Sequence, residues 1–441
     1  MLIKPSDNQE TSDIFKLPEN YQTNIELFRE IAEHRSLFTE EMALKIKESE
    51  YIKDFDEAIK KGLATILDII SNIQEQGFSY KNADPGHGVG HLLRDTLHSS
   101  VIVGNTDEET SKNSPSEVYV GFVCSALHDI GCVVIDRYQD VNSINKHAEI
   151  GGLIVGRFLK EATDIPEEII NAIVWGIMAH TNIKKDFKMS VDGEEYIIPP
   201  YKDTHDSGEP IYFVDVVKQT DRLDVNGLIF ICRHFLTRYR TIADFSGGDY
   251  RMQSFNQHMQ FNGEVGTMLE HLKMYLRSQE EDNGIHNKND LPSMIKQRKK
   301  YSKELGNFIK DIETTEEEDL INPEDIHNTL KEFLDFLDIY IEPRLDSENI
   351  GSEPNPKKPI YIDMLEKEFL NLDILIQRRW LTQLIKIKDH YPVFIDRLIG
   401  ENDTTKYVSK VMFPKTTKTI GEILGYNINK KISDKVNKIL G

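Results

Sequence analysis

The chain is poor in cysteine: Cys124, Cys132 and Cys232 are the three thiols among 441 residues, and they form no CxxC pair. So sparse a set excludes a disulfide scaffold or a zinc site built from cysteines, and it fits a reducing compartment. The opening MLIKPSDNQE lacks the apolar segment of a secretory signal, and the longest apolar-leaning run, residues 118–127, is too short to cross a bilayer. We therefore expect a cytoplasmic protein with no membrane partner.

Positive charge is also in short supply. Acidic side chains number 74 against 53 basic ones, which gives a formal net charge of −21. Such an excess repels a phosphate backbone or an anionic lipid surface at long range, so nucleic acid is disfavoured as a partner. At about 150 residues per domain, the length fits three domains or one large domain with extensions.

Helical periodicity is what the chain has most of. Apolar side chains recur mostly at three- and four-residue steps through 59–73, and the segment 88–182 has the same character between polar loops. In 184–210, Asp192-Gly193 separates two short segments of strand character, a pattern typical of a tight hairpin. The sequence therefore predicts a mainly α fold with an all-helical core, a small β-hairpin insertion and a further mostly helical C-terminal region.

The domain organisation is predicted from breakers and shifts in composition. The clearest linker is 350–359, which is rich in proline, glycine and charge. The tail from position 403 to 441 holds eight lysines against three acidic residues, and we expect its terminal helix to pack on the protein body or on another subunit of a homo-oligomer. The predicted regions are a helical extension at 1–80, a domain with the candidate site at 81–240, further helices at 241–349, and a C-terminal region with a basic tail at 360–441.

Histidines and aspartates recur along the helical segments in an order that suggests a metal centre: His91, the doublet His128-Asp129, His147, His180 and Asp221. The doublet follows a run of mostly apolar residues, so we expect it to be buried. A buried imidazole and carboxylate need compensation, which a metal ion supplies. Six such ligands with a bridging carboxylate can hold two metal ions. Two metal ions held in this way activate a water molecule for phosphoryl displacement.

This order resembles the HD-domain superfamily of metal-dependent phosphohydrolases, an all-helical fold. The resemblance covers about a third of the chain, from about His87 to Asp224. His91 with Arg94 is similar to the family's HxxR element, and His128-Asp129 is similar to its naming doublet. Asp221 in TDRLD resembles the closing aspartate element, commonly written ADRLD.

Two further histidines, His147 and His180, resemble those found in members that bind two metals. The resemblance implies two divalent ions, drawn from Mn, Fe, Zn, Mg or Ni, with the first held by His91, His128, Asp129 and Asp221. It also implies that Asp129 bridges the ions and positions the attacking hydroxide, as the catalytic residue, while His147 and His180 complete the second site. Arg94 and Lys146 are candidates to bind the substrate phosphate.

The implied activity is hydrolysis of a phosphoester or phosphoanhydride bond in a small phosphorylated molecule, with a nucleotide as the expected class. Cys132 stands where the cyclic-di-GMP-cleaving subgroup carries a lysine, and that subgroup's GYP element is missing. The pattern over 168–181 looks more like small HD hydrolases that cleave dinucleoside polyphosphates. An HD-fold di-iron oxygenase and a nucleotide-sensing regulatory protein with a weakly active site are the alternatives. The 184–210 insertion is also a candidate lid.

Overall fold

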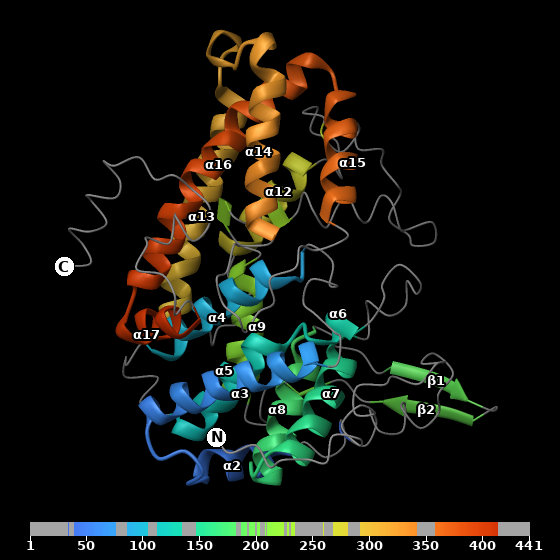
Figure 1. Ribbon diagram of the computed structural model, residues 1–441, viewed down its shortest axis with the longest axis vertical. Coiled ribbons are helices and arrows are strands. Elements are labelled where there is room, and N and C mark those ends of the chain that lie inside the picture. The colour runs from blue at the N-terminus through green and yellow to red at the C-terminus, as the bar shows by residue number, and fades with distance from the viewer. Residues whose placement is uncertain are drawn as a thin grey trace. The chain divides into compact units, whose positions relative to one another are not determined.

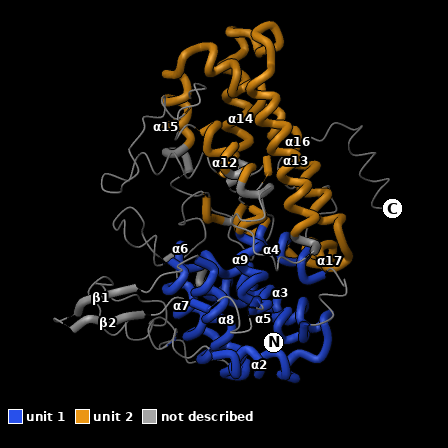
Figure 2. The backbone as a smooth tube through the Cα atoms, turned by 180° about the vertical axis from the view of Figure 1, so that it is seen from behind, with its two compact units in different colours: residues 1–83, 95–221, 349–351 blue, residues 84–94, 222–348, 352–441 orange. Residues whose placement is uncertain are grey.

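The described residues of the computed structural model are mainly α-helical, which confirms the predicted fold class at that level. They fall into two compact units, distinguished by colour in Figure 2: unit 1 contains 1–83, 95–221 and 349–351, and unit 2 contains 84–94, 222–348 and 352–441. The four regions expected from composition remain predictions. The structure describes residues 34, 39–75, 86–104, 113–134, 147–181, 187–191, 194–198, 201–202, 208, 210–224, 227–228, 231–233, 259, 268–280, 292–341 and 358–412.

The helices that carry the candidate site are labelled in Figure 1. Those of unit 1 are α2 (Glu40–Glu48), α3 (Phe55–Glu75), α5 (Pro115–Leu127), α6 (Gly131–Val134), α7 (His147–Ala162) and α8 (Glu167–Ala179). Two more helices, α4 (Val89–Val103) and α9 (Tyr212–Asp224), run from one unit into the other. Within unit 1, α5 packs against both α3 and α8, and α7 packs along α8.

Helix α5 begins at a capping box. The Ser114 hydroxyl accepts a hydrogen bond from the Glu117 amide at 3.2 Å, and the Glu117 carboxylate accepts one from the Ser114 amide at 2.8 Å. Pro115 follows the cap, where its fixed φ suits the first helical residue. Every residue from Ser116 to Leu127 is buried, so this helix delivers the His128-Asp129 doublet into the core.

Glycine allows the next close approach. A Cβ on Gly131 would lie 2.0 Å from the His147 carbonyl oxygen, so a larger residue here would push the start of α7 away. Gly152 similarly lets α7 approach α8, since a Cβ there would lie 2.6 Å from the Met178 side chain. Because only four residues join α7 to α8, the two helices pack antiparallel. His147 at the start of α7 therefore comes next to His180 at the end of α8.

Unit 2 is built around the long helix α16. Trp380 on this helix is fully buried and donates its indole N–H to the Met259 carbonyl at 2.8 Å. Asp373 caps the helix by accepting the Leu375 amide at 2.9 Å. The other helices are α12 (Met268–Glu280), α13 (Pro292–Thr314), α14 (Ile326–Ile341), α15 (Lys358–Leu370), α16 (Ile374–Gly400) and α17 (Asp403–Met412), with short 3-10 turns at Glu317–Asp319 and Pro323–Asp325.

Two strands are assigned within the predicted insertion. β1 (Phe187–Val191) and β2 (Glu194–Ile198) pair antiparallel, with Phe187 opposite Ile198. Asp192-Gly193, most of the 350–359 linker and the tail beyond residue 412 lie outside the described residues. Among the helices that the structure describes, none is both long enough and apolar enough to cross a membrane.

Candidate metal centre

Unit 1 gathers imidazole and carboxylate groups from five helices. The residues lie around the end of α5: Asp95 on α4, His128 and Asp129 after α5, His147 on α7, His180 after α8, and Asp221 on α9. Asp95, His128, Asp129 and His180 are buried, whereas the side chains of His147 and Asp221 are 13% and 29% exposed. The cluster is therefore most open on the side of Asp221 and His147.

The His128 ring has a defined orientation. Its Nδ1 lies 2.9 Å from the Ser125 carbonyl oxygen, which can only accept, so Nδ1 carries the proton and Nε2 carries the lone pair. Three carboxylates surround Nε2: Asp95 and Asp129 at 3.5 Å each, and Asp221 at 3.8 Å. The ligand atoms of Asp95, His128 and Asp221 all lie within 4.8 Å of one another. This is a donor set of one imidazole and several carboxylates around one point.

A second set of donors lies beside Asp129 Oδ1, and the ligand atoms of His180, Asp129 and His128 all lie within 4.8 Å of one another. The Nε2 atoms of His147 and His180 are 3.0 Å apart, and they lie 3.3 and 3.8 Å from Asp129 Oδ1. His180 donates Nδ1–H to the Ile177 carbonyl at 2.6 Å, which leaves the lone pair on the Nε2 that faces His147. Burial, followed by the nearby imidazoles of His128 and His147, lowers the pKa of His180 to about 3. A neutral imidazole is the form that binds a metal.

Asp129 faces both groups. Its Oδ2 lies 3.5 Å from His128 Nε2, while its Oδ1 faces His147 and His180. A carboxylate in this position can bridge two ions, and the bridging role that the resemblance implies for Asp129 stays a prediction. The Cys132 thiol also approaches Asp129 Oδ1, at 3.9 Å.

The donor chemistry fits divalent ions. Two ligands that each lie about 2.1 Å from one ion in tetrahedral geometry are separated by about 3.4 Å. The spacings between these donors run from 3.0 to 3.8 Å. Buried nitrogen and carboxylate oxygen donors suit zinc, manganese and iron. The residues present therefore fit one or more such ions, and they would hold them through Nε2 and carboxylate oxygens.

The remaining predicted residues of the first motif belong to unit 2. His91 Nδ1 lies 2.7 Å from Asp224 Oδ2, and both side chains are buried. Arg94 is 2% exposed and donates to both Asp224 oxygens, from Nε to Oδ1 and from Nη2 to Oδ2, the latter at 3.0 Å. Arg94 is therefore paired with Asp224 within unit 2, and its role in binding a substrate phosphate stays a prediction. Lys146 lies outside the described residues.

Two acidic residues were not anticipated from the sequence as parts of this arrangement. Asp95 lies four residues after His91 on α4, a spacing that places both on one face of the helix. That spacing is the sequence signal for Asp95 as a ligand, whereas the HxxR element points to Arg94. Asp224 closes the TDRLD segment, and no pattern in the sequence shows that it pairs with Arg94, 130 positions away.

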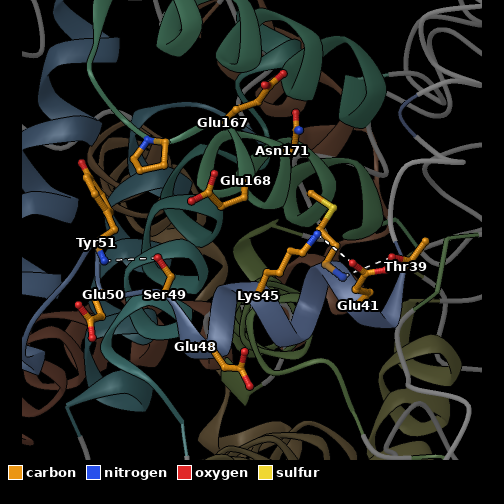
Figure 3. A pocket seen from close by; sticks show the side chains of 12 residues that line it. Thr39, Glu41, Lys45, Glu48, Ser49, Glu50, Tyr51, Glu167, Glu168 and Asn171 are labelled. Atoms are coloured by element: carbon orange, nitrogen blue, oxygen red, sulfur yellow. Dashed lines mark hydrogen bonds and ion pairs between the residues drawn. The ribbon is translucent and has the colours of Figure 1, made fainter.

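A separate cavity lies at the opposite end of α8. It encloses about 740 Å³ between α2 and the start of α8, and Figure 3 shows glutamates and Lys45 around it. Lys45 pairs with Glu41 at 2.9 Å. α8 has 13 residues and is therefore about 20 Å long, so the cavity is well removed from His180. None of the predicted metal ligands lines it.

Comparisons with protein-family models, with curated proteins and with solved structures find no match for this chain. The helical fold and the buried cluster of histidine and aspartate are compatible with an HD-like metal site.

Proposed function

We propose that this protein is a metal-dependent phosphohydrolase that cleaves a phosphoester or phosphoanhydride bond in a nucleotide. The arrangement of Asp129 carries the proposal. Its Oδ2 faces His128, and its Oδ1 faces His147 and His180. A bridging carboxylate between two ions is the arrangement that two-metal hydrolysis requires.

The side chains divide the chemistry between them. Bound divalent ions lower the pKa of water and neutralise phosphate oxygens. Asp129 and His128 present their ligand atoms from the buried end of α5. The hydrogen bond to the Ser125 carbonyl orients the His128 ring. Asp221 is the most exposed acid of the cluster, so a phosphate group would approach from its side.

Nucleophilic catalysis by cysteine is disfavoured by the surroundings of two of the thiols. Burial raises the pKa of the Cys124 thiol far above its usual range, and the Cys124 Sγ donates to the Ile173 carbonyl at 3.3 Å. Burial likewise raises the pKa of Cys232. Because the thiolate is the reactive form, neither residue is a competent nucleophile at neutral pH. Activated water is the nucleophile that fits this site.

The test combines metal content with a substrate panel. Full-length protein purified without chelator is analysed for bound elements, then assayed with nucleoside triphosphates, cyclic nucleotides, cyclic dinucleotides and dinucleoside polyphosphates. We expect bound divalent metal and hydrolysis of at least one of these classes. Both should be lost in His128→Ala and Asp129→Ala.

Asp215→Asn is the matched control for Asp129→Ala, since Asp215 on α9 is likewise a buried aspartate of unit 1 but accepts a hydrogen bond from the Gln219 side-chain amide. It should keep the metal and the activity. Two equivalents of iron with oxygen uptake and no hydrolysis would replace the proposal by the di-iron oxygenase. Tight nucleotide binding without metal or turnover would replace it by the sensor.

A further inference from the structure

Asp224 lies at the centre of a buried polar network in unit 2. The carboxylate is fully buried and accepts hydrogen bonds from His91 Nδ1 and from two nitrogens of Arg94. The Arg233 guanidinium lies 3.7 Å from the same carboxylate. Two guanidinium groups and one imidazole therefore surround a single acid.

The charge of Asp224 is set by these neighbours. Arg94 donates to both oxygens of this carboxylate, through Nε and Nη2, and this bidentate geometry is the one a guanidinium forms with an ionised carboxylate. Asp224 is therefore an ionised acceptor. An ionised acceptor keeps the proton of His91 on Nδ1, and the lone pair is then on Nε2.

In two histidines of unit 1, Nδ1 also donates a hydrogen bond and Nε2 carries the lone pair, but the acceptor is a backbone carbonyl. His128 and His180 direct Nδ1 to the backbone carbonyls of Ser125 and Ile177. A carboxylate is a stronger acceptor than a carbonyl, and it makes the opposite nitrogen a more basic metal ligand. His91 is thus prepared for coordination in the same sense as the other two.

Arg94 is held in turn by the C-terminal helices. Its Nη1 donates to the Tyr391 hydroxyl of α16 at 3.5 Å, and Tyr391 is buried. The two residues are 297 positions apart in the sequence. This contact links the support of His91 to a region for which the sequence suggested no role.

We propose that Asp224 is a positioning residue, which fixes the tautomer and ring orientation of His91 for metal binding, with Arg94, Arg233 and Tyr391 holding the carboxylate in place. The proposal rests on the proposed function, together with the family resemblance, which implies that His91 is a metal ligand. It adds an acid outside the predicted ligand set.

The test uses full-length protein with Asp224→Asn, which keeps the shape of the side chain and removes its charge. Protein with ¹⁵N-labelled histidine reports the tautomer of His91 in the metal-free state, with His91→Ala assigning the signal. Manganese or zinc affinity is measured by titration. We expect the wild type to carry the proton on Nδ1, and Asp224→Asn to lose that preference and bind metal about 10- to 100-fold more weakly. Asp224→Glu should recover part of the affinity.

A folded Asp224→Asn protein with an unchanged tautomer, or with wild-type metal affinity, would overturn the proposal. If Asp224→Asn does not fold, Asp224→Asn combined with Arg94→Gln removes both charges together and is measured instead, with the same expectations. If the wild type binds no metal, the proposed function fails. In that case a tautomer that still depends on Asp224 marks a purely structural contact, which overturns the positioning role as well.

Discussion

Asp129 in unit 1 and Asp224 in unit 2 are both buried aspartates that face histidine, but their surroundings differ in charge. Asp224 is bound by Arg94 on both oxygens and approached by Arg233. Asp129 faces the imidazoles of His128, His147 and His180. The carboxylates of Asp95 and Asp221 also lie near His128. One acid is balanced by permanently charged side chains. Asp129, in contrast, belongs to a group of three carboxylates around the His128 imidazole, and a neutral imidazole does not offset their negative charge.

The difference separates stability from function. A buried carboxylate with a bidentate guanidinium is electrostatically complete, so its loss is felt as a loss of folding free energy. Several carboxylates around one imidazole disfavour one another's ionised form, and a bound cation removes this repulsion. We therefore assign the proposed metal chemistry to the cluster around Asp129 in unit 1, and the proposed positioning of His91 to Asp224 in unit 2.

The largest effect is expected for Asp129→Asn. The variant keeps the shape of the side chain but removes the charge that faces both groups of imidazoles, so hydrolysis should fall about 1000-fold or more, which corresponds to roughly 4 kcal/mol of transition-state stabilisation. Activity and bound metal are measured on the same sample. A variant that keeps full metal and full activity would remove Asp129 from the site.

Arg94→Ala should destabilise the fold by about 3 to 5 kcal/mol, because it leaves the Asp224 charge buried without its main partner. Chemical denaturation of the metal-free protein measures this. Arg397→Ala is the control in the same unit: Arg397 pairs with Glu304 at 2.9 Å but is 32% exposed, so the change should stay below about 1 kcal/mol. An unaltered unfolding free energy with a raised KM would support the substrate role for Arg94.

His180→Ala should reduce the metal content from two ions to about one, because His147 and His180 contribute to one group of donors and His128 to the other. Elemental analysis of the purified variant gives the ratio. His390→Ala, which removes a histidine of α16 next to Glu304, should bind as much metal as the wild type. Loss of both ions in His180→Ala would mean that the two groups form a single site.

The smallest effect is expected at Asp396 on α16, where burial raises the pKa to about 6. A folded-state pKa above the unfolded value means that the folded state binds more protons between about pH 4 and pH 6, so stability falls as the pH rises through this window. Asp396→Asn should therefore stabilise the protein by about 1 kcal/mol at pH 7, after allowance for partial exposure, and much less near pH 4. A pH-independent difference in unfolding free energy would contradict this origin.

The sequence was enough to predict the helices and the burial of the segment that leads to His128-Asp129. The apolar run before His128 predicts a buried helix, and α5 is buried from Ser116 to its end. The residues His128, Asp129, His147, His180 and Asp221 were also predictable, since each lies on or at the end of a predicted helix, and unit 1 brings them together.

The role of Arg94 could not be predicted in the same way. Its position one turn after His91 placed it near the site, but its partner was decided by residues 130 and 297 positions away. Periodicity reports which face of a helix is buried, and it carries no information about which distant polar group meets that face.

The sequence by itself determined a mainly helical protein with imidazoles and carboxylates at its helix ends, because apolar periodicity is a local property of the chain. Tertiary structure alone decided that Asp95 lies beside His128, that Asp129 faces three imidazoles, and that Asp224 pairs with His91 and Arg94. The physical reason is that a buried charge must be matched by whatever polar group the packing brings within hydrogen-bonding distance.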